Sequence, residues 1–265
     1  MPFSTSPMGP ELVGLIPAAG RANRIAPLPC SKELYPVGFR LEKNSQGKRP
    51  KVVAHYLLEK IRLAGISKVY FVLRAGKWDV PGYFSDGSML DMHVAYLIVN
   101  SSWGVPCTLD HAFPFVQHAI VAFGFPDILF EAPDAFATLL ARQSENHADI
   151  VLGLCAKRQN PKCDLVDFNS DGTVRKIILG TLDERVHYSW AVAVWTPVFT
   201  KFLHDYVDRH HSRSEYLEEL SVGHAIQASI EAGIRVESVV VSEEPYLDIG
   251  TPDDLAEAIR RETGS

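Results

Sequence analysis

The fold of this chain is decided in residues 14–37, which read Gly14-Leu-Ile-Pro-Ala-Ala-Gly20-Arg-Ala-Asn-Arg24-Ile-Ala-Pro-Leu-Pro-Cys-Ser-Lys32-Glu-Leu-Tyr-Pro36-Val. The apolar start predicts a buried strand, and the small residues at 18–22 predict a tight turn after it. Small side chains let backbone amides approach phosphate oxygens, and Arg24 and Lys32 would neutralise their charge. The stretch therefore favours a polyphosphate site, although a plain strand-to-helix turn would look the same if it stood alone.

The order and spacing of these motifs resemble the sugar nucleotidyltransferase family. The matching features are Ala18-Ala19-Gly20, Arg24, Pro27, Ser31-Lys32 and Leu34-Tyr35-Pro36-Val37. The Ser-Lys pair is similar to the glucose-1-phosphate thymidylyltransferase branch. Ala22 and Asn23 replace the family's usual Gly-Thr, so we expect a less open phosphate loop. The resemblance extends from Leu12 through Ala258.

Apolar runs alternate with helical patterns along the chain, which predicts an α/β fold with helices on a mostly parallel sheet. The resemblance implies a three-layer Rossmann-like fold of the nucleotide-diphospho-sugar transferase (GT-A-like) type. We expect one domain over 1–265, with a nucleotide half at about 11–130 and an acceptor half at about 131–262. The expected strands are 12–17, 68–73, 92–99, 119–125, 150–155, 190–195 and 235–241, with a hairpin at 165–178. The expected helices are 52–64, 108–118, 133–145, 197–209 and 216–232, and one opened by Thr251-Pro252. Polar, basic residues 40–51 are interpreted as a solvated loop.

Composition excludes several classes of protein. The chain has 265 residues, 46% of them hydrophobic, a formal charge of −6 and a pI near 5.9, which argues against a general nucleic-acid or anionic-membrane surface. The start of the chain lacks a signal-peptide pattern, and no apolar stretch approaches the roughly 20 residues of a membrane span. The four cysteines show no metal spacing, so we expect reduced, mostly buried thiols in a cytoplasmic protein. Cys30, Cys107, Cys155 and Cys163 make up this set.

Two aspartates follow apolar stretches and are candidates for a metal site. Asp127 follows 119–126, and Asp248 lies in Tyr246-Leu-Asp-Ile-Gly-Thr-Pro252. An acid just after a buried strand lies at the carboxyl edge of an open α/β sheet, where ligands bind. Mg²⁺ is commonly held by one or two carboxylates together with phosphates and water. A helix or turn cap is the alternative for each aspartate, but the resemblance implies metal binding for both.

The resemblance also implies roles in the nucleotide half. Arg24 would stabilise the leaving pyrophosphate, and Lys32 would hold oxygens near the α-phosphorus. The expected nucleotide-binding residues are Ala18, Ala19, Gly20, Arg21, Asn23, Asn100, Gly104 and Thr108.

The acceptor half departs from the family pattern. A family Lys that binds the sugar phosphate would fall near Leu179-Gly180-Thr181, where no cation occurs. Asp164 stands where the family has a Gly, and Val192 replaces a Gly that makes room for the sugar ring. The expected acceptor-binding positions are therefore Asp164, Gly180 and Val192. Replacement cations are sought at Lys157, Arg158, Lys162 and Arg185.

The sequence hypothesis is a Mg²⁺-dependent nucleotidyltransferase. It would join an NTP, with dTTP or UTP favoured, to a sugar 1-phosphate or related phosphorylated small molecule and release pyrophosphate. No nucleic-acid or membrane partner is expected, and a homo-oligomer is left open. A non-catalytic nucleotide-binding or regulatory homologue is the main alternative. A metal-dependent glycosyltransferase is disfavoured because Asp127 is followed by Ile128-Leu129 instead of completing an Asp-x-Asp.

Overall fold

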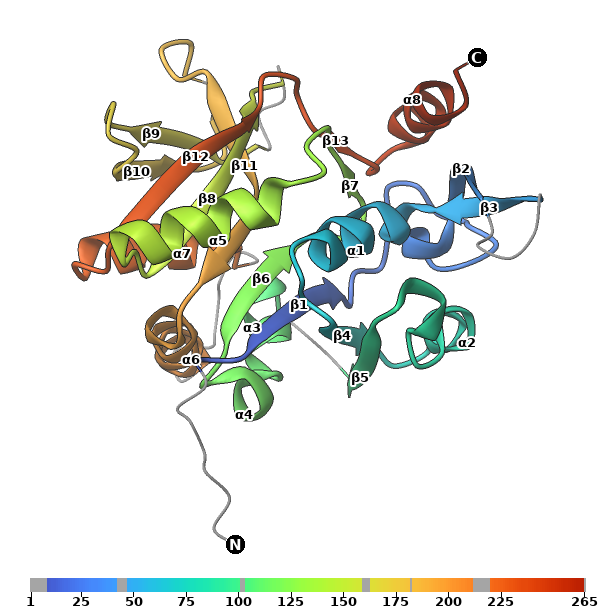
Figure 1. Cartoon of the computed structure of the whole chain (residues 1–265), viewed down its shortest axis with the longest axis horizontal. Helices are drawn as coiled ribbons and strands as arrows, with labels where there is room; N and C mark the ends of the chain where they lie inside the picture. The colour runs from blue at the N-terminus through green and yellow to red at the C-terminus, as the bar shows by residue number, and fades with distance from the viewer. Residues whose placement is uncertain are drawn as a thin grey trace, which may run out of the picture.

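A computed structural model of the chain describes residues 9–41, 47–100, 103–158, 163–181, 183–211 and 220–264. A mixed central sheet lies between two layers of helices, which confirms the predicted α/β class and layer arrangement (Figure 1). None of the described helices is long and apolar enough to cross a membrane.

Within the described residues the main sheet has nine strands. Along its main path the order is β10-β9-β11-β6-β1-β4-β5, and β8 pairs with both β11 and β12. Strands β6, β1, β4 and β5 are parallel neighbours, whereas β11 runs antiparallel to β6 and β8. The loops that follow β1 and β6 therefore leave the same edge of the sheet. The bounds are β1 Leu12–Ala18, β4 Lys68–Arg74, β5 His93–Val99, β6 Ile120–Gly124, β8 Ile150–Ala156, β9 Leu165–Phe168, β10 Val174–Ile178, β11 Tyr188–Trp195 and β12 Val236–Ser242.

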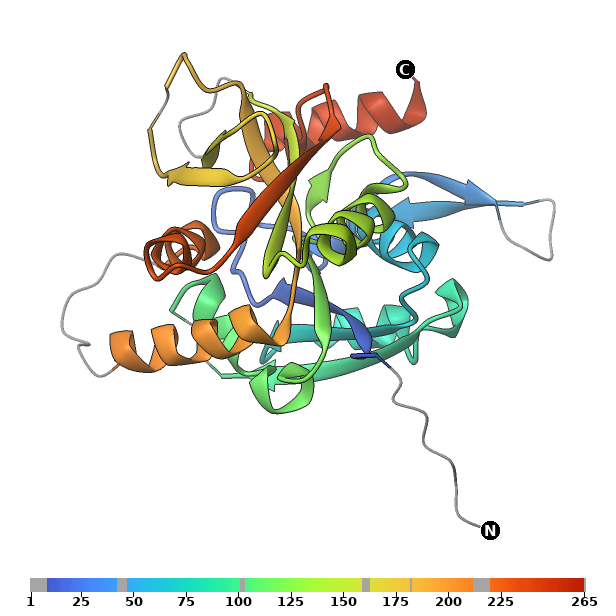
Figure 2. The same cartoon turned by 60° about the vertical axis from the view of Figure 1, so that its left-hand side comes forward.

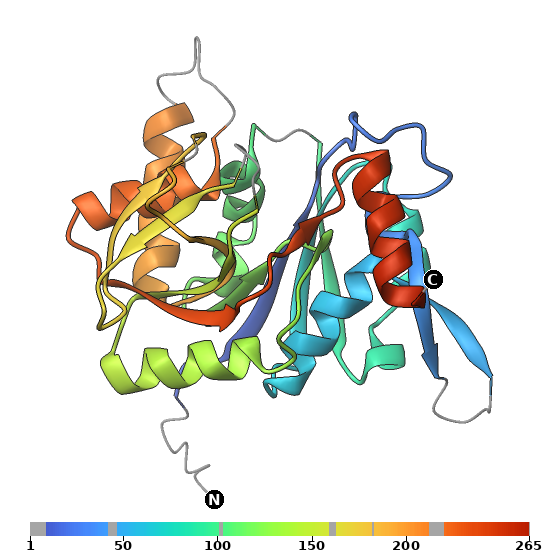
Figure 3. The same ribbon diagram turned by 90° about the horizontal axis from the view of Figure 1, so that it is seen from above.

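Side chains of β1 alternate between two apolar cores, one on each face of the sheet, as a buried strand requires. Ile16 and Ala18 join the core beneath α1, α2 and α5, and Val13 and Leu15 join the core beneath α3, α4, α6 and α7. Figure 3 shows these two layers from above. The first layer is α1 Val53–Leu63, α2 Asp79–Phe84 and α5 Ala135–Asn146. The second is α3 Val105–Asp110, α4 Phe113–Val116, α6 Pro197–His211 and α7 Val222–Glu231.

Two expected helices are corrected. The expected helix at 108–118 is two short helices, α3 and α4, because Pro114 near the start of α4 has no N–H to continue the hydrogen-bond ladder. The expected helix at 216–232 begins at Val222 as α7, where the Ser221 hydroxyl accepts from the His224 N–H; residues 216–219 lie outside the described residues.

The expected loop at 40–51 is a hairpin in its described part. Strand β2 Pro36–Leu41 pairs antiparallel with β3 Lys48–Val52, and this pair projects from the body of the molecule (Figure 2). The polar, basic composition of β3 gives no apolar alternation that would mark it as a strand. Helix α8 Pro252–Thr263 packs against β2, and its predicted start is confirmed because the Thr251 hydroxyl accepts from the Asp254 N–H at 3.2 Å. The remaining short elements are η1 Lys32–Leu34, η2 Ser88–Leu90, β7 Ile128–Leu129 and β13 Leu247–Asp248.

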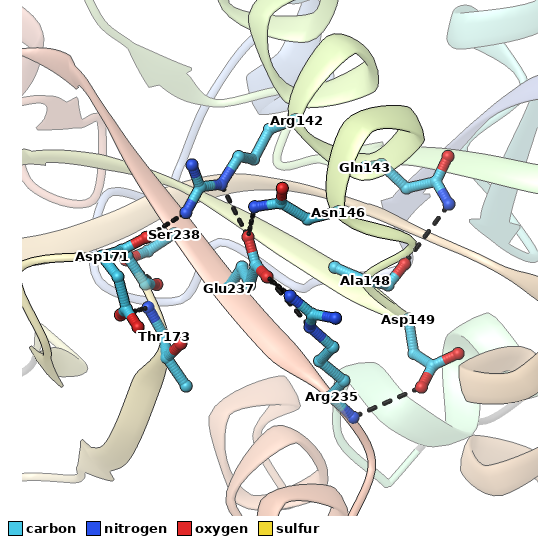
Figure 4. Close-up of polar contacts among 11 residues, drawn as sticks. Arg142, Gln143, Asn146, Ala148, Asp149, Asp171, Thr173, Arg235, Glu237 and Ser238 are labelled. Atoms are coloured by element: carbon cyan, nitrogen blue, oxygen red, sulfur yellow. Dashed lines mark hydrogen bonds and ion pairs between the residues drawn. The ribbon is translucent and has the colours of Figure 1, made fainter.

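A buried carboxylate joins the outer strand β12 to α5. Glu237 accepts hydrogen bonds of 2.6 Å from Arg142 Nε, Asn146 Nδ2 and Arg235 Nη2, and Figure 4 shows the three donors around it. Burial alone would raise the pKa of Glu237, but these hydrogen bonds hold it below its usual range. The network fixes this edge of the sheet.

The cysteines are mostly buried, as the sequence predicts. None of the four forms a disulfide, Cys30 is half-buried, and the other three are buried. Burial raises the pKa of the Cys155 thiol to about 12, so it is neutral and unreactive at pH 7.

His55 on α1 gives the fold a pH dependence. Its side chain is 0% exposed, lies against Tyr83 and Phe84, and has no hydrogen-bond partner for either ring nitrogen among the described residues. Burial, together with Arg40 and Lys51, lowers the pKa of His55 to about 4. Because the unfolded chain binds the proton first, stability should fall as pH drops from about 6.5 to 4, by about 3 kcal/mol in total.

We expect His55→Phe to reduce the pH dependence of the free energy of unfolding between pH 7 and 4, measured by urea unfolding. The matched control is His93→Phe at an exposed position, which should leave the profile of the wild type unchanged. Equal slopes for the wild type and His55→Phe would contradict the assignment.

Candidate functional site

The turn after β1 keeps a glycine-like backbone without a glycine at its central position. Ala22 has φ 54°, in the left-handed region that costs a non-glycine residue about 1–2 kcal/mol. Hydrogen bonds from the Ile25 and Ala26 N–H groups to the Ala22 carbonyl, 3.1 and 3.0 Å long, close the turn. Ala22 stands where the family that the sequence resembles usually has Gly. The loop at Ala22 therefore has the backbone conformation that Gly favours, and the Ala22 side chain adds a methyl group.

Lys32 lies at the start of the short helix η1, and contacts of neighbouring residues hold this helix in place. Next to it, Glu33 and Lys77 form a buried ion pair, with Lys77 Nζ 2.7 and 2.9 Å from the two carboxylate oxygens and side chains only 5% and 8% exposed. The Asp79 carboxylate accepts from the backbone N–H and the hydroxyl of Ser31, at 2.6 and 2.8 Å. These contacts tie η1 to the loop after β4 and leave Lys32 little freedom to move.

Asp127 and Asp248 lie on two chain segments that are paired. The two-residue strands β7 and β13 are antiparallel neighbours, and the Ile249 N–H donates to the Asp127 carbonyl at 3.0 Å. Lys32 Nζ forms an ion pair with Asp127 Oδ2, and Arg24 Nη2 lies 3.9 Å from Asp248 Oδ2. Both cations and both carboxylates predicted from the sequence therefore meet at one edge of the sheet.

The charged side chains at this edge shift one another's pKa values. Burial and the charge of Asp127 raise the pKa of Asp248, while Lys32 and Arg24 oppose this rise. Burial would lower the pKa of Lys32, but the Asp127 carboxylate raises it above its ordinary value, so Lys32 is protonated at pH 7. Two carboxylates share a confined space with one lysine between them, and added positive charge would relieve their repulsion.

A cavity of about 370 Å³ opens at this edge and contains most of the predicted nucleotide residues. Ala18, Ala19, Gly20, Arg24, Lys32, Gly104, Thr108, Asp127, Asp164 and Asp248 all line it. A second cavity of about 520 Å³ shares Ala19, Gly20, Arg24 and Lys32 and adds Arg21, Asn23, Arg74, Trp103 and Gly250.

Three of the sequence-predicted positions line neither cavity. Asn100 is exposed after β5, and Gly180 is exposed with φ 63°. Val192 lies in the core, 1% exposed, with a methyl group that fills the space beside Gly153. Val192 thus packs into the core and does not contact the cavity, because its side chain points to the helix face of β11 that α5 covers.

Glycines create room at two points of the site. A Cβ on Gly104 would overlap the Leu220 backbone, and its φ of 91° suits only glycine. A Cβ on Gly250 would lie 2.8 Å from Arg24 Nη2, so the glycine after Asp248-Ile249 leaves space for the guanidinium.

The sequence missed the apolar residues that line the cavity. Phe125, Trp190, Val222 and Tyr246 line the 370 Å³ cavity, together with Ser221. Trp190 and Tyr246 were visible only as strand residues, and no local pattern marks a strand residue that faces a cavity. The proposed replacement cations are engaged elsewhere: Lys157 donates to the Asp183 carbonyl at 2.7 Å, Arg158 pairs with Asp254 at 3.5 Å, and Arg185 pairs with Asp183 at 2.7 Å. Lys162 lies outside the described residues.

A separate cluster with metal-ligand geometry lies between α3 and α6. In the described part of the chain, Asp110, His204 and Asp208 form the group whose ligand atoms all lie within 4.8 Å of one another. His204 Nδ1 lies 2.8 Å from Asp110 Oδ1, and the His204 ring stacks on Phe113 at 3.9 Å. None of these residues lines the cavity at the sheet edge.

Comparisons with known proteins place the fold. No protein-family model matches the chain, and no curated protein matches it in sequence. Among solved structures, the chain is similar to a protein assigned as a glucose-1-phosphate thymidylyltransferase from Bacillus anthracis, with TM-score 0.77, 14% identity and 95% of both chains covered. It is also similar to the inositol-1-phosphate CTP transferase from T. maritima, with TM-score 0.70, 18% identity and coverage of 96% and 98%.

A UDP-glucose pyrophosphorylase complexed with UDP-glucose is a third structural neighbour, with TM-score 0.74, 14% identity and coverage of 95% and 98%. At these identities the chain shares the fold of nucleotidyltransferases over nearly its whole length. The fold implied by the sequence resemblance is thereby confirmed.

The Glu33–Lys77 pair predicts a measurable coupling. Lys77→Met leaves Glu33 buried without a partner and should destabilise the protein by about 3–5 kcal/mol in urea unfolding. The double variant Glu33→Leu, Lys77→Met should recover much of this loss because no buried charge remains.

The control is Lys68→Met, which removes an exposed ion pair with Glu11 and should cost less than about 1 kcal/mol. If the double variant lost as much free energy of unfolding as the two single variants lose together, the two side chains would not be coupled, and the ion pair would not be what holds η1 in place.

Proposed function

We propose that this protein is a nucleotidyltransferase that transfers a nucleotide from an NTP to a phosphorylated small molecule and releases pyrophosphate. The observation that carries the proposal is the meeting of Arg24 and Lys32 with Asp127 and Asp248 in one cavity beside the small-residue turn. This arrangement supplies cations for phosphates and carboxylates for a metal within a single pocket. The shared fold of the structural neighbours supports the same class of reaction.

The proposed reaction is a direct in-line displacement. An oxygen of the acceptor phosphate attacks the α-phosphorus, a new P–O bond forms, and the bond to the β-phosphate oxygen breaks. Lys32, held between η1 and Asp127, would neutralise oxygens near the α-phosphorus. Arg24 would bind the leaving pyrophosphate. Catalysis then comes from positioning and charge neutralisation, with no covalent enzyme intermediate.

The carboxylates fit a divalent cation. The pKa of Asp248 is raised by burial and by the nearby Asp127 charge, so a cation between them would be stabilised. Mg²⁺ prefers one or two carboxylate oxygens with phosphates and water, which this pair can supply. Asp127 and Asp248 would hold the ion, which would neutralise phosphate charge when bound.

The nucleotide and the acceptor are proposed by analogy. The resemblance to thymidylyltransferases favours dTTP or UTP, and Gly104, Thr108 and the 18–22 turn would contact the nucleotide. The named neighbours act on sugar or inositol phosphates, so a sugar 1-phosphate is the starting expectation for the acceptor.

A non-catalytic nucleotide-binding protein is the second candidate. One observation favours it: among the described residues lining the cavity, no cation other than Arg24 and Lys32 is present to bind an acceptor phosphate. Tight NTP binding without turnover of any acceptor would support this candidate.

The primary test is a thermal-shift screen of NTPs with Mg²⁺. A bound NTP at about 100 times its Kd should add roughly 2.7 kcal/mol of stability. Asp127→Asn and Asp248→Asn should abolish the Mg²⁺-dependent part of this shift and reduce pyrophosphate release at least 100-fold, since metal and phosphate contacts are lost.

The control is Asp205→Asn on the exposed surface of α6, which should behave as the wild type. Full Mg²⁺-dependent activity in both site variants would disprove the assignment of the carboxylates.

Gly250 offers a test of Arg24 that leaves Arg24 in place. Gly250→Ala should displace the guanidinium without damaging the fold and weaken NTP binding about tenfold, equivalent to about 1.4 kcal/mol. Calorimetric titration with an NTP measures the change. Gly82→Ala is the matched control because a Cβ there meets no heavy atom within 4 Å. Unchanged affinity in Gly250→Ala would remove Arg24 from the proposed site.

A further inference from the structure

The distal part of the cavity is the part lined by Asp164, whose carboxylate lies against Gly223 at the start of α7, whereas Lys32 pairs with Asp127. Asp164, which precedes β9, lines it together with Trp190 of β11 and Tyr246 before β13. Phe125 and the start of α7 complete the wall. An acceptor whose phosphate lay beside Lys32 would place its other end in this part of the cavity.

The charge in the distal part is negative. Asp164 is the one charged side chain there among the described lining residues, since the other lining charges lie at the nucleotide end. Lys157 and Arg158, the basic residues that precede Asp164 in the described part of the chain, are paired elsewhere. A second anionic group on the acceptor would meet Asp164 without a counter-ion, whereas a cation would be attracted.

The structure is built to hold the Asp164 carboxylate in this position. A Cβ on Gly223, in the first turn of α7, would overlap Asp164 Oδ2, so the glycine lets the carboxylate lie against the helix start. The positive end of a helix favours a negative charge. Burial raises the pKa of Asp164 to about 6, and the Trp190 indole N–H and His224 oppose this rise, so the group is mostly ionised at pH 7.

Few other polar groups of this part are free. Ser221 Oγ accepts from the His224 N–H, the Tyr246 hydroxyl interacts with Cys163, and among the described residues only the buried Trp190 Nε1 of this wall has no hydrogen-bond partner. A sugar ring brings several hydroxyls, each of which needs a partner when buried. One carboxylate among aromatic rings suits a single positive charge better, since ammonium groups bind both carboxylates and aromatic faces.

We propose that the acceptor is a phosphomonoester that carries an ammonium group, not a sugar 1-phosphate, and that Asp164 pairs with that ammonium. This inference rests on the nucleotidyltransferase function proposed above. The chemistry is unchanged: the acceptor phosphate oxygen bonds to the α-phosphorus, and pyrophosphate leaves. Asp164 acts as a specificity-determining residue and takes no part in bond making.

The test measures pyrophosphate release from the full chain with Mg²⁺ and each common NTP. The acceptors are phosphocholine, phosphoethanolamine, glucose 1-phosphate and 3,3-dimethylbutyl phosphate, the last being the uncharged isostere of phosphocholine. We expect kcat/KM for the ammonium compounds to exceed that for glucose 1-phosphate and for the isostere by about 10-fold or more, as expected for a lost charge pair.

Asp164→Asn keeps the shape and removes the charge. It should raise KM for phosphocholine about 10- to 100-fold, leave kcat for the uncharged isostere unchanged, and erase the preference between the two. NTP binding by thermal shift should stay at the wild-type level, which excludes misfolding. The control is Asp167→Asn, three residues further along, whose carboxylate pairs with Arg175 on the surface.

The outcomes separate the two proposals. Failure of every NTP to bind would overturn the nucleotidyltransferase function and this inference with it. NTP binding with preferred turnover of glucose 1-phosphate would overturn only the inference, as would NTP binding with no turnover of either ammonium compound. A phosphocholine preference that survives Asp164→Asn would remove Asp164 from the recognition of the ammonium.

Discussion

The ion pair between Lys32 and Asp127 joins the loop after β1 to the loop after β6, and the rest of the site is arranged around it. On one side, the buried Glu33–Lys77 pair keeps η1 from moving. On the other, the pairing of β7 with β13 brings Asp248 next to Asp127. A lysine held in this way stays protonated in a partly buried place, since the neighbouring carboxylate compensates for lost hydration.

The two ends of the cavity differ in charge. The end near Arg24 and Lys32 combines these two cations with the carboxylates of Asp127 and Asp248. The distal end has one carboxylate among aromatic rings. Structural neighbours with 14–18% identity share the fold over about 95% of the chain, yet such a likeness does not fix which molecule enters the distal end. Side chains at a few cavity positions decide this, and some of them, such as Trp190 and Val222, also pack in the core.

Strong local patterns in the sequence predict the scaffold. The apolar runs predict the parallel strands, and aspartates placed after strands predict that Asp127 and Asp248 share an edge with Arg24 and Lys32, which the structure bears out as a matter of position. The roles of these residues stay predictions. Pairings between distant segments could not be predicted from the sequence. Strands β7 and β13 have two residues each, which is too few for any periodic pattern. The β2–β3 hairpin was missed because β3 is basic and carries a proline, a composition that predicts a solvated loop. Val192 was misplaced because a sequence match cannot tell which face of β11 its side chain occupies.

The closure of the site by β13 has a consequence for biosynthesis. Lys32, Asp127 and Asp248 are far apart in sequence, since 95 residues separate the first two and 121 the last two, and the last carboxylate arrives just before α8. At translation rates of about 5–20 residues per second, an emerging chain would expose the Lys32 turn and β7 for several seconds or more before β13 could pair with β7. Asp248 and Gly250 then fix the position of Arg24. A ribosome-bound intermediate thus has the 18–22 turn but lacks the second carboxylate, and it gains the complete pocket only when the C-terminal segment docks.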